Sequence, residues 1–390
     1  MYETQPVHSE RAILFGLCHP GSDEKERGER SLEELGALAE ACGAEVVNSI
    51  LQTRSKPDSA TYIGKGKLAE IRVAAEVLQA NLLICDDELT GSQLRNIEEE
   101  TGLRTIDRTN LILDIFATRA KTREGRWQVE LAQHEYRLPR LKSVAGELSR
   151  QGGGIGTRGP GETKLETDRR YIRRRIQKLK KNLKELSIHR ELLRQSRNDR
   201  CVYTIAVVGY TNAGKSTLVN HLCHSKLFVA DQVFATLDAT VRQLYLPGNQ
   251  LRQKDTVLID TIGFINKLPH QLIEAFKSTL AEAAHADLLL IVVDGSDPDA
   301  DEKLKTTRIL LHEIGAGSIP QVTAINKIDK INRIDISSVL YSLSIDDGAG
   351  PPVEVSALTG DGLDELKIRL DKRLNDLAQS PLRIDYVLHR

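Results

Sequence analysis

The sequence is poor in several features that would assign it to a special class of protein. Of its 390 residues only 4% are aromatic and five are cysteines, which form no CxxC pair and are expected to be reduced thiols in the core. The N-terminus lacks a basic segment followed by an apolar one, and the longest apolar run, ADLLLIVV, is far too short to cross a bilayer. We therefore expect a cytoplasmic, monomeric protein without a membrane span.

Net charge is also nearly absent, but the formal sum of -1 hides a strongly basic region. Residues 169–198 carry twelve Lys and Arg against two Asp and Glu. Solvated helix faces usually mix both signs, so this charge favours a polyanion as partner. Apolar residues recur in the same region at helical spacing, as in a helical hairpin or a coiled coil. They are Leu165, Ile172, Ile176, Leu179, Leu183, Leu186 and Leu193.

Alternating strand-like and helix-like segments predict an α/β protein of several parts. Residues 1–118 are expected to form a small N-terminal α/β domain with a largely parallel sheet. Residues 119–200 are expected to form a basic, coiled-coil-like helical linker, which contains a glycine-rich loop at 152–161. Residues 201–378 have the pattern of a doubly wound, mainly parallel nucleotide-binding domain. Residues 379–390 are a short tail.

A nucleotide-binding motif stands in the third part, where GYTNAGKST follows the apolar strand TIAVV and opens a helix. It matches GxxxxGK[ST] in the strand–loop–helix context that makes such a match specific for a phosphate-binding P-loop. Loop amides and the helix N-terminus favour phosphate, Lys215 is expected to reach the β- and γ-phosphates, and Ser216 to ligate Mg²⁺. The expected contacts are Gly209, Tyr210, Thr211, Asn212, Ala213, Gly214, Lys215, Ser216 and Thr217.

Two later segments select guanine over adenine. NKID follows an apolar strand, and a carboxylate at Asp329 accepts from the ring N–H and the exocyclic amine of guanine, a donor pair that adenine lacks. SAL, at the end of another strand, is expected to touch the base from the other side. The expected base contacts are Asn326, Lys327, Ile328, Asp329, Ser356, Ala357 and Leu358.

Two segments between these motifs have the features of nucleotide-dependent switches. DTIG, comprising Asp260, Thr261, Ile262 and Gly263, ends a strand and is expected to place an acid near Mg²⁺ and the Gly263 amide at the γ-phosphate. FATLD, comprising Phe234, Ala235, Thr236, Leu237 and Asp238, offers the Thr236 hydroxyl to Mg²⁺ when the γ-phosphate is present, with Thr240 as a rival. The expected catalytic residues are Lys215, Thr236 and Gly263, and the expected metal ligands are Ser216 and Thr236.

Two residues of these motifs bear on the rate of hydrolysis. Phe264 follows Gly263, where Ras-type enzymes carry the glutamine that orients the attacking water, so we expect slow hydrolysis that a bound partner accelerates. Asn212 offers a carbonyl oxygen near the phosphates, where K⁺ would replace an arginine finger. Stabilisation of the loop turn is an equally good explanation of Asn212.

At this point the chain resembles the HflX family of ribosome-associated GTPases, a group related to Obg. The resemblance rests on GYTNAGKST, FATLDATVR, DTIGFI, NKID and SAL, preceded by YIGKGK, RAKTREGRWQVELAQ and GGGIGTRGPGETKLETDRR, and spans roughly residues 11–375. It implies a C-terminal Ras-like GTPase domain, binding to the large ribosomal subunit in the GTP state, and dissociation of stalled or inactive 70S ribosomes. Many relatives have a further C-terminal domain, whereas only about a dozen residues follow the last expected helix here.

The resemblance places the glycine-rich loop at ribosomal RNA near the peptidyl transferase centre. The residues expected there are Gly154, Gly156, Arg158, Gly159, Gly161, Arg169 and Arg170. Pro160 removes an amide that a phosphate loop would use, and a flexible interdomain linker is the alternative interpretation of this stretch. Some family members also hydrolyse ATP through the N-terminal domain, but Gly64-Lys65-Gly66-Lys67 lacks the strand–loop–helix context and is expected to be a loop contact.

Two other functions fit the same motifs. One is a GTP-dependent factor that assembles the large subunit without splitting 70S particles. The other is a GTP switch whose target is a protein, with the basic helices serving only as an arm. Both share the nucleotide site, so the sequence does not separate them from the first interpretation.

Overall fold

The computed structural model describes residues 10–148, 160–199, 202–223, 240–247, 255–267, 282–331 and 350–379, with single positions between them. These residues form two compact units. The first comprises the chain up to Thr118 together with Arg126–Leu183 and Pro269–Leu272, and the second comprises Arg119–Gly125, Lys184–Leu268 and the chain from Ile273. Each unit is described separately below.

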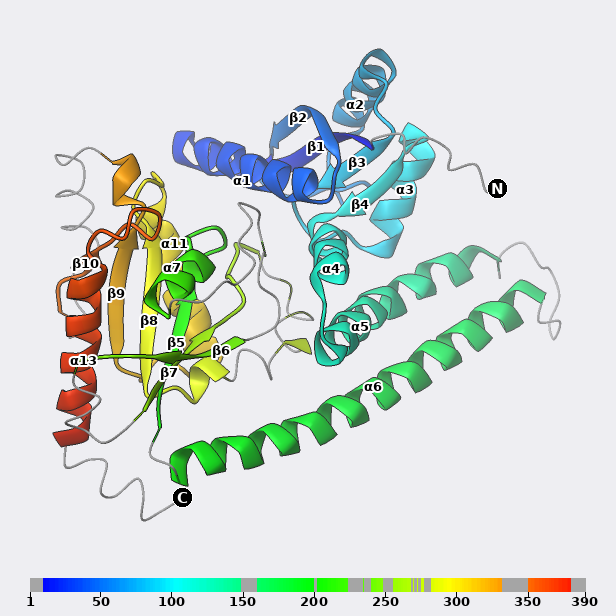
Figure 1. Ribbon diagram of the computed structural model, residues 1–390. Coiled ribbons are helices and arrows are strands. Elements are labelled where there is room, and N and C mark those ends of the chain that lie inside the picture. The colour runs from blue at the N-terminus through cyan, green and yellow to red at the C-terminus, as the bar shows by residue number, and fades with distance from the viewer. Residues whose placement is uncertain are drawn as a thin grey trace, which may run out of the picture. The chain divides into compact units, whose positions relative to one another are not determined.

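The first unit contains a sheet whose described strands are all parallel, in the order β2-β1-β3-β4. Its helices connect the strands, so the predicted α/β domain with a parallel sheet is confirmed (Figure 1). The core on one face joins alternate residues of β1, such as Ile13 and Phe15, to Ile71 of α2 and Ile97 of α3. The elements are β1 Arg11–Cys18, α1 Ser22–Ala41, β2 Glu45–Thr53, α2 Lys65–Leu78, β3 Leu82–Cys85, α3 Gly91–Thr101, β4 Arg104–Asp107 and α4 Arg108–Arg119.

Two details of this unit correct the expectations. Gly64-Lys65-Gly66-Lys67 is not a loop, because Gly64 is the N-cap of α2 and the helix begins at Lys65. Cys42 is exposed rather than buried, because it is the C-cap where α1 ends at the surface. Cys18 and Cys85 are buried free thiols, as expected.

The middle region consists of two long helices, α5 Arg123–Leu148 and α6 Pro160–Asp199. They lie side by side in Figure 1, joined by a bidentate pair of Arg175 with Glu130 (2.6 and 2.7 Å) and by Lys180 with Glu135 (2.8 Å). Leu179, in the predicted apolar stripe, is fully buried. Of the two alternatives for 162–198, the hairpin is therefore wrong, because that stretch is one helix. Its ion pairs with α5 agree with the other alternative, a pairing of helices as in a coiled coil.

The start of α6 also shortens the predicted glycine-rich loop. Pro160 is the first residue of the helix, a position where its missing N–H and fixed φ are tolerated. Gly161 therefore belongs to α6 and not to the loop. Among the described helices of both units, none is long and apolar enough to cross a membrane.

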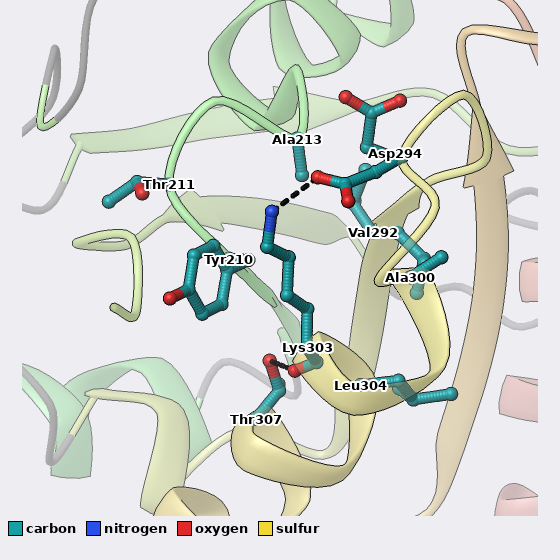
Figure 2. Close-up of a pocket in the computed structure, with 11 residues that line it drawn as sticks. Tyr210, Thr211, Ala213, Val292, Asp294, Ala300, Lys303, Leu304 and Thr307 are labelled. Carbon is teal, nitrogen blue, oxygen red and sulfur yellow. Dashed lines mark hydrogen bonds and ion pairs between the residues drawn. The ribbon is translucent and has the colours of Figure 1, made fainter. Parts of the chain in front are cut away.

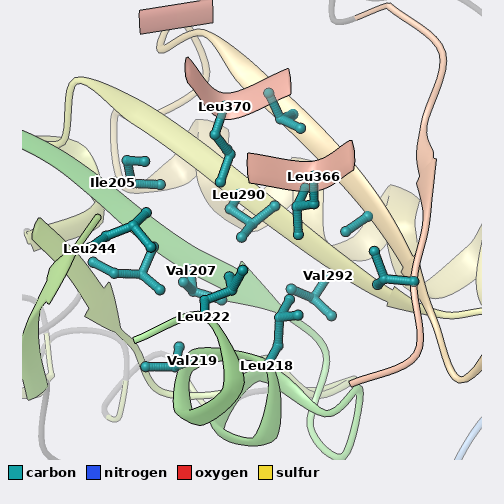
Figure 3. Packing of buried hydrophobic residues seen from close by; sticks show 14 of the residues in the cluster. Ile205, Val207, Leu218, Val219, Leu222, Leu244, Leu290, Val292, Leu366 and Leu370 are labelled. Carbon is teal, nitrogen blue, oxygen red and sulfur yellow. The ribbon is translucent and has the colours of Figure 1, made fainter. Parts of the chain in front are cut away.

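The second unit is built on a sheet with the described order β10-β9-β8-β5-β7-β6, in which only the pairing of β6 with β7 is antiparallel. This confirms the doubly wound, mainly parallel domain. Leu218 and Leu222 of α7 and Leu366 and Leu370 of α13 close one core over β5 and β8 (Figure 3). The elements are β5 Tyr203–Gly209, α7 Lys215–Leu222, β6 Thr240–Leu244, β7 Thr256–Asp260, β8 Leu288–Asp294, α11 Ala300–Glu313, β9 Gln321–Asn326, η1 Ile328–Lys330, β10 Val353–Glu354 and α13 Leu363–Gln379.

Candidate functional site

The P-loop joins the end of β5 to the start of α7, and two of its residues must be glycine. Gly209 and Gly214 have φ angles of +148° and +87°. A Cβ atom at Gly209 would lie 2.2 Å from the carbonyl oxygen of Val292, and one at Gly214 would lie 2.2 Å from Asn326 Nδ2. Only glycine fits such contacts and angles, so the loop packs against β8 and β9 and leads directly into the N-terminus of α7.

Lys215, the first residue of α7, is buried behind this loop. Its Nζ atom donates a hydrogen bond of 2.7 Å to the carbonyl oxygen of Tyr210. Burial lowers the pKa of Lys215 to about 8, and the charge of Asp260 acts in the opposite direction. Negative charge from a polyphosphate would favour the ammonium form, so this lysine is suited to bind an anion.

Ser216 and Asp260 form the part of the site that suits a metal ion. The Ser216 hydroxyl donates to Asp260 Oδ2 at 2.7 Å, and Asp260 is fully buried at the end of β7. Both donors are oxygen atoms, which Mg²⁺ prefers, and Mg²⁺ commonly binds through one or two such groups, waters and substrate phosphates. The residues present therefore fit Mg²⁺. Thr236, the other predicted metal ligand, lies outside the described residues.

The segment after Asp260 is paired with the P-loop. The Phe264 amide donates to the Gly209 carbonyl at 3.0 Å, and the Thr211 amide donates to the Phe264 carbonyl at 2.7 Å. Gly263 is held so close that a Cβ atom there would lie 2.9 Å from both Lys215 Nζ and Thr211 Cα. Phe264 itself is only 2% exposed, so its ring is packed inward and cannot order a water molecule.

Three segments meet where the guanine base is expected. Asn326 Nδ2 donates to the Ala213 carbonyl at 2.8 Å, and Asn326 Oδ1 accepts from the Ala357 amide at 2.9 Å. The Ser356 hydroxyl donates to Asp329 Oδ1 at 2.6 Å. The P-loop, NKID and SAL are thus tied together, although they are far apart in the sequence.

The remaining predicted residues have varied positions. Thr217 lies in α7 and Ile328 in η1. The Thr261 hydroxyl donates to the Val207 carbonyl at 2.6 Å. Ile262 and Phe234 are buried, whereas Leu358 is exposed. Thr240, the rival of Thr236, is half-buried in β6. The other switch positions, Ala235, Leu237 and Asp238, lie outside the described residues, as do Gly154, Gly156, Arg158 and Gly159. Arg169 is half-buried, and Arg170 is exposed and pairs with Glu166 at 3.5 Å.

Comparison with known proteins decides what kind of site this is. Family models described as GTP-binding GTPase N-terminal, GTP-binding GTPase Middle Region and 50S ribosome-binding GTPase match residues 29–117, 119–197 and 204–327. GTPase HflX of Caldanaerobacter subterraneus subsp. tengcongensis is 48% identical over 94% of this chain and 81% of its own length. GTPase HflX of Escherichia coli K12 is 42% identical over 96% and 85%. The chain belongs to the HflX family of GTPases.

A solved structure of a GDP-bound protein is similar over nearly the whole chain. The crystal structure of SsGBP in complex with GDP matches 94% of this chain and 99% of its own with 27% identity and a TM-score of 0.52. Membership of the HflX family makes the chain a GTP-binding enzyme that hydrolyses GTP to GDP and phosphate. P-loop GTPases usually bind the nucleotide together with Mg²⁺, which the donors of Ser216 and Asp260 fit.

The structure adds an acidic residue that the sequence analysis missed. Lys327 has a left-handed backbone conformation (φ +65°), and its Nζ atom pairs with Asp294 Oδ2 at 2.6 Å. Asp294 ends the apolar strand β8, as Asp260 ends β7. The position of Asp294 at the end of an apolar strand could have indicated a functional acid. Only the fold shows that this acid pairs with Lys327.

A small pocket adjoins the P-loop on the side of α11 (Figure 2). It is lined by Tyr210 and Thr211 of the loop, by the end of β8 and by the first turns of α11. Lys303 of α11 lies beside the Tyr210 ring, 5.2 Å from its centroid, and pairs with Asp297. The P-loop is therefore supported from α11 as well as from the strands.

Proposed function

We propose that this HflX-family GTPase binds the large ribosomal subunit in its GTP state and dissociates stalled or inactive 70S ribosomes, and that hydrolysis is linked to its release. The observation that carries the proposal is the basic outer surface of α6, in a chain whose GTPase domain matches a model described as 50S ribosome-binding GTPase.

The outer surface of α6 is suited to a nucleic acid. Its exposed cations would displace counterions from a phosphate backbone. Tyr171, which lies among them, is 65% exposed and offers a ring on which a base can stack. The exposed cations are Arg170, Arg173, Arg174, Lys178, Lys180, Lys181 and Lys184, of which Arg170 also pairs with Glu166 and Lys180 with Glu135 of α5.

The glycine-rich stretch connects α5 to α6, so the basic helix follows it directly. Arg158 within the stretch and Arg169 and Arg170 after it supply positive charge, while glycines permit a close approach to an RNA backbone. We propose that this stretch contacts ribosomal RNA near the peptidyl transferase centre of the large subunit.

At the nucleotide, we propose that Lys215 and the Gly263 amide stabilise charge on the transferred phosphoryl group. Ser216 and Thr236 would hold Mg²⁺, which neutralises the phosphates, and Asp329 would read guanine. Because the Phe264 ring is packed inward, we expect large ribosomal subunits to raise the GTPase rate at least about tenfold, a barrier change near 1.4 kcal/mol. An unchanged rate would count against the ribosome as partner.

Asn212 is the basis of a separate proposal about K⁺. It has a left-handed conformation (φ +61°) and is exposed at the P-loop, a position from which its side-chain oxygen can reach the phosphates and a monovalent cation. Faster hydrolysis in K⁺ than in Na⁺, lost in Asn212→Ala, is expected. Equal rates in the two salts would indicate that Asn212 only stabilises the turn of the P-loop.

Cosedimentation with ribosomal subunits tests the proposal most directly. With a non-hydrolysable GTP analogue the chain should pellet with large subunits, and with GDP it should remain in the supernatant. Sucrose gradients should show loss of 70S particles with the analogue. Association with precursor particles alone would replace splitting by a role in assembly.

Charge reversal on α6 tests the nucleic-acid surface. Arg173→Glu together with Arg174→Glu should weaken binding to the large subunit and reduce the slope of log affinity against log salt by about two, because two phosphate contacts are lost. The matched control is Arg72→Glu with Lys372→Glu, which reverses two exposed cations elsewhere. A flat salt response of the unmodified protein would favour a protein target.

A further inference from the structure

Tyr210 contacts both the phosphate-binding lysine and the switch segment that begins at Asp260. Its backbone carbonyl accepts from Lys215 Nζ, and its backbone forms a parallel bridge with Phe264. Its phenol oxygen accepts a hydrogen bond of 2.6 Å from the backbone amide of Asn266. One residue of the P-loop thus holds the middle of the switch segment through its backbone and the end of the segment through its side chain.

Helix α11 also contacts Asn266 and Tyr210. The Thr306 hydroxyl lies 3.0 Å from the Glu302 carbonyl and 3.3 Å from Asn266 Oδ1, so the two oxygens share its one proton. Asn266 is therefore held mainly by its backbone from Tyr210, with a weaker contact of its side chain to the helix. Lys303 lies beside the ring of Tyr210 in Figure 2, at a distance suited to a cation–π contact. Tyr210 is only 6% exposed, so its hydroxyl bonds where water competes little.

We infer that Tyr210 is a positioning residue that sets the preference of this GTPase for GTP over GDP. The inference rests on the nucleotide geometry proposed above, in which the Gly263 amide meets the γ-phosphate. Gly263 lies three residues before Asn266. It belongs to the segment that Tyr210 holds through the Tyr210 backbone and through the Tyr210 hydroxyl. Loss of the hydroxyl would free the far end of this segment while the P-loop itself stays intact.

The effect should appear with GTP and not with GDP. GDP contacts the P-loop and the base-binding loops, none of which depends on the phenol oxygen. The γ-phosphate adds the contact with Gly263, whose amide must be held in one place to bind well, because an amide that fluctuates must be ordered on binding. A hydrogen bond of average strength corresponds to about fivefold in affinity.

Tyr210→Phe tests this inference, because the substitution keeps the ring and removes only the hydroxyl. We expect the affinity for a non-hydrolysable GTP analogue with Mg²⁺ to fall about fivefold and the affinity for GDP to change less than about twofold. Hydrogen exchange in the peptide that contains residues 260–267 should become faster. Tyr245→Phe, which removes an exposed hydroxyl next to β6 in the same unit, should change none of these values.

Asn266→Ala separates the backbone contact from the side-chain contact, because it keeps the amide that donates to Tyr210. Its effect on the ratio of the two affinities should be smaller than that of Tyr210→Phe. Equal losses of GDP and analogue affinity in Tyr210→Phe, or no loss of either, would overturn the inference. Failure of the unmodified protein to bind GTP would instead contradict the proposed nucleotide site.

Discussion

Each of the two units has a strand that ends in a fully buried aspartate, and the two aspartates have different roles. Asp107 ends β4 and accepts hydrogen bonds from two backbone amides, from the Tyr136 hydroxyl at 2.7 Å and from Arg140 at 3.2 Å. Asp260 ends β7 and accepts from the Ser216 hydroxyl at 2.7 Å, beside the P-loop. In the first unit the carboxylate fixes α5 to the sheet, whereas in the second it faces residues that suit a metal ion and phosphates.

A second pair of strand ends shows the same contrast. Asp86 after β3 accepts from Arg108 at 2.7 Å and from Ser31 at 2.7 Å, and Arg108 is almost fully buried. Asp294 at the end of β8 pairs with Lys327 of the guanine-recognition motif. An acid after a buried strand therefore predicts a place at the carboxyl edge of the sheet. Its role depends on the cations and hydroxyls that other segments bring to that edge.

Loss of Lys215 should have the largest effect and should touch only the second unit. Lys215→Ala removes the cation that the P-loop holds for the β- and γ-phosphates, so GTP binding or turnover should fall below detection. Nucleotide titration and phosphate release measure the effect. Lys305→Ala removes an exposed lysine of α11 that pairs with Asp301, and it should retain turnover. Full activity of Lys215→Ala would refute the P-loop assignment.

Asp329→Asn should change the base that is recognised. The substitution turns a carboxylate that accepts two hydrogen bonds into an amide that can donate, so GTP loses affinity and xanthosine triphosphate gains it. A site that hydrogen-bonds its substrate can reject an analogue that leaves those groups unpaired by about 10⁴-fold. Competition between the two nucleotides measures the change. An unaltered preference for GTP would show that Asp329 does not read the base.

Asp107→Ala tests the structural use of the same residue type. Removing one partner of a buried ion pair typically lowers the free energy of unfolding by about 3 kcal/mol, because Arg140 and the backbone amides lose their acceptor. The single tryptophan, Trp127, lies in α5, so its fluorescence during denaturation reports on the first unit. GTP affinity should stay unchanged.

The control for this variant is Glu29→Ala on α1, which breaks an exposed pair with Lys25 and should cost less than about 1 kcal/mol. If Asp107→Ala were as stable as Glu29→Ala, the network at the end of β4 would contribute little to the stability of the fold. If it also weakened GTP binding, the two units would not be separable in function.

Features that depend on local pattern could be predicted from the sequence. The P-loop, with its preceding strand and following helix, is one continuous stretch. Central strands such as β1, β3 and β8 follow from apolar runs, whereas β4, with the sequence RTID, does not. Glycine is needed at Gly209 and Gly214 for reasons of backbone angle and contact that the motif already implies. The family resemblance and the α/β fold therefore follow from short stretches of sequence alone.

Features that join distant segments could not be predicted. The periodicity of α6 shows that Leu179 must be covered, but not that this helix pairs with α5 rather than with a second half of the same stretch. Asp294 and Lys327 belong to different strand ends, and the Tyr210 hydroxyl meets an amide 56 positions away. Sequence spacing within a helix or strand does not report such contacts, because they arise from the order of strands in the sheet.

The smallest expected effect is a pH dependence of nucleotide binding. We expect it to arise from Lys215 and not from Asp107. Burial lowers the pKa of Lys215 to about 8 without nucleotide, and bound phosphates raise it, so binding takes up a proton above that pH. Affinity for GDP should fall about fourfold between about pH 7 and about pH 8.5. Calorimetry in buffers of different ionisation enthalpy should detect proton uptake at the higher pH only.

The sign of the accompanying stability change is opposite. Between about pH 8 and the ordinary lysine pKa of 10.5, the unfolded chain binds more protons at Lys215 than the folded chain, so this residue raises the free energy of unfolding as pH rises. The nucleotide-free protein should therefore gain stability from Lys215 over a range where it loses nucleotide affinity. Asp107→Ala should preserve both trends, since the Asp107 carboxylate belongs to the other unit. Nucleotide binding without proton uptake near pH 8.5 would contradict a Lys215 pKa of about 8.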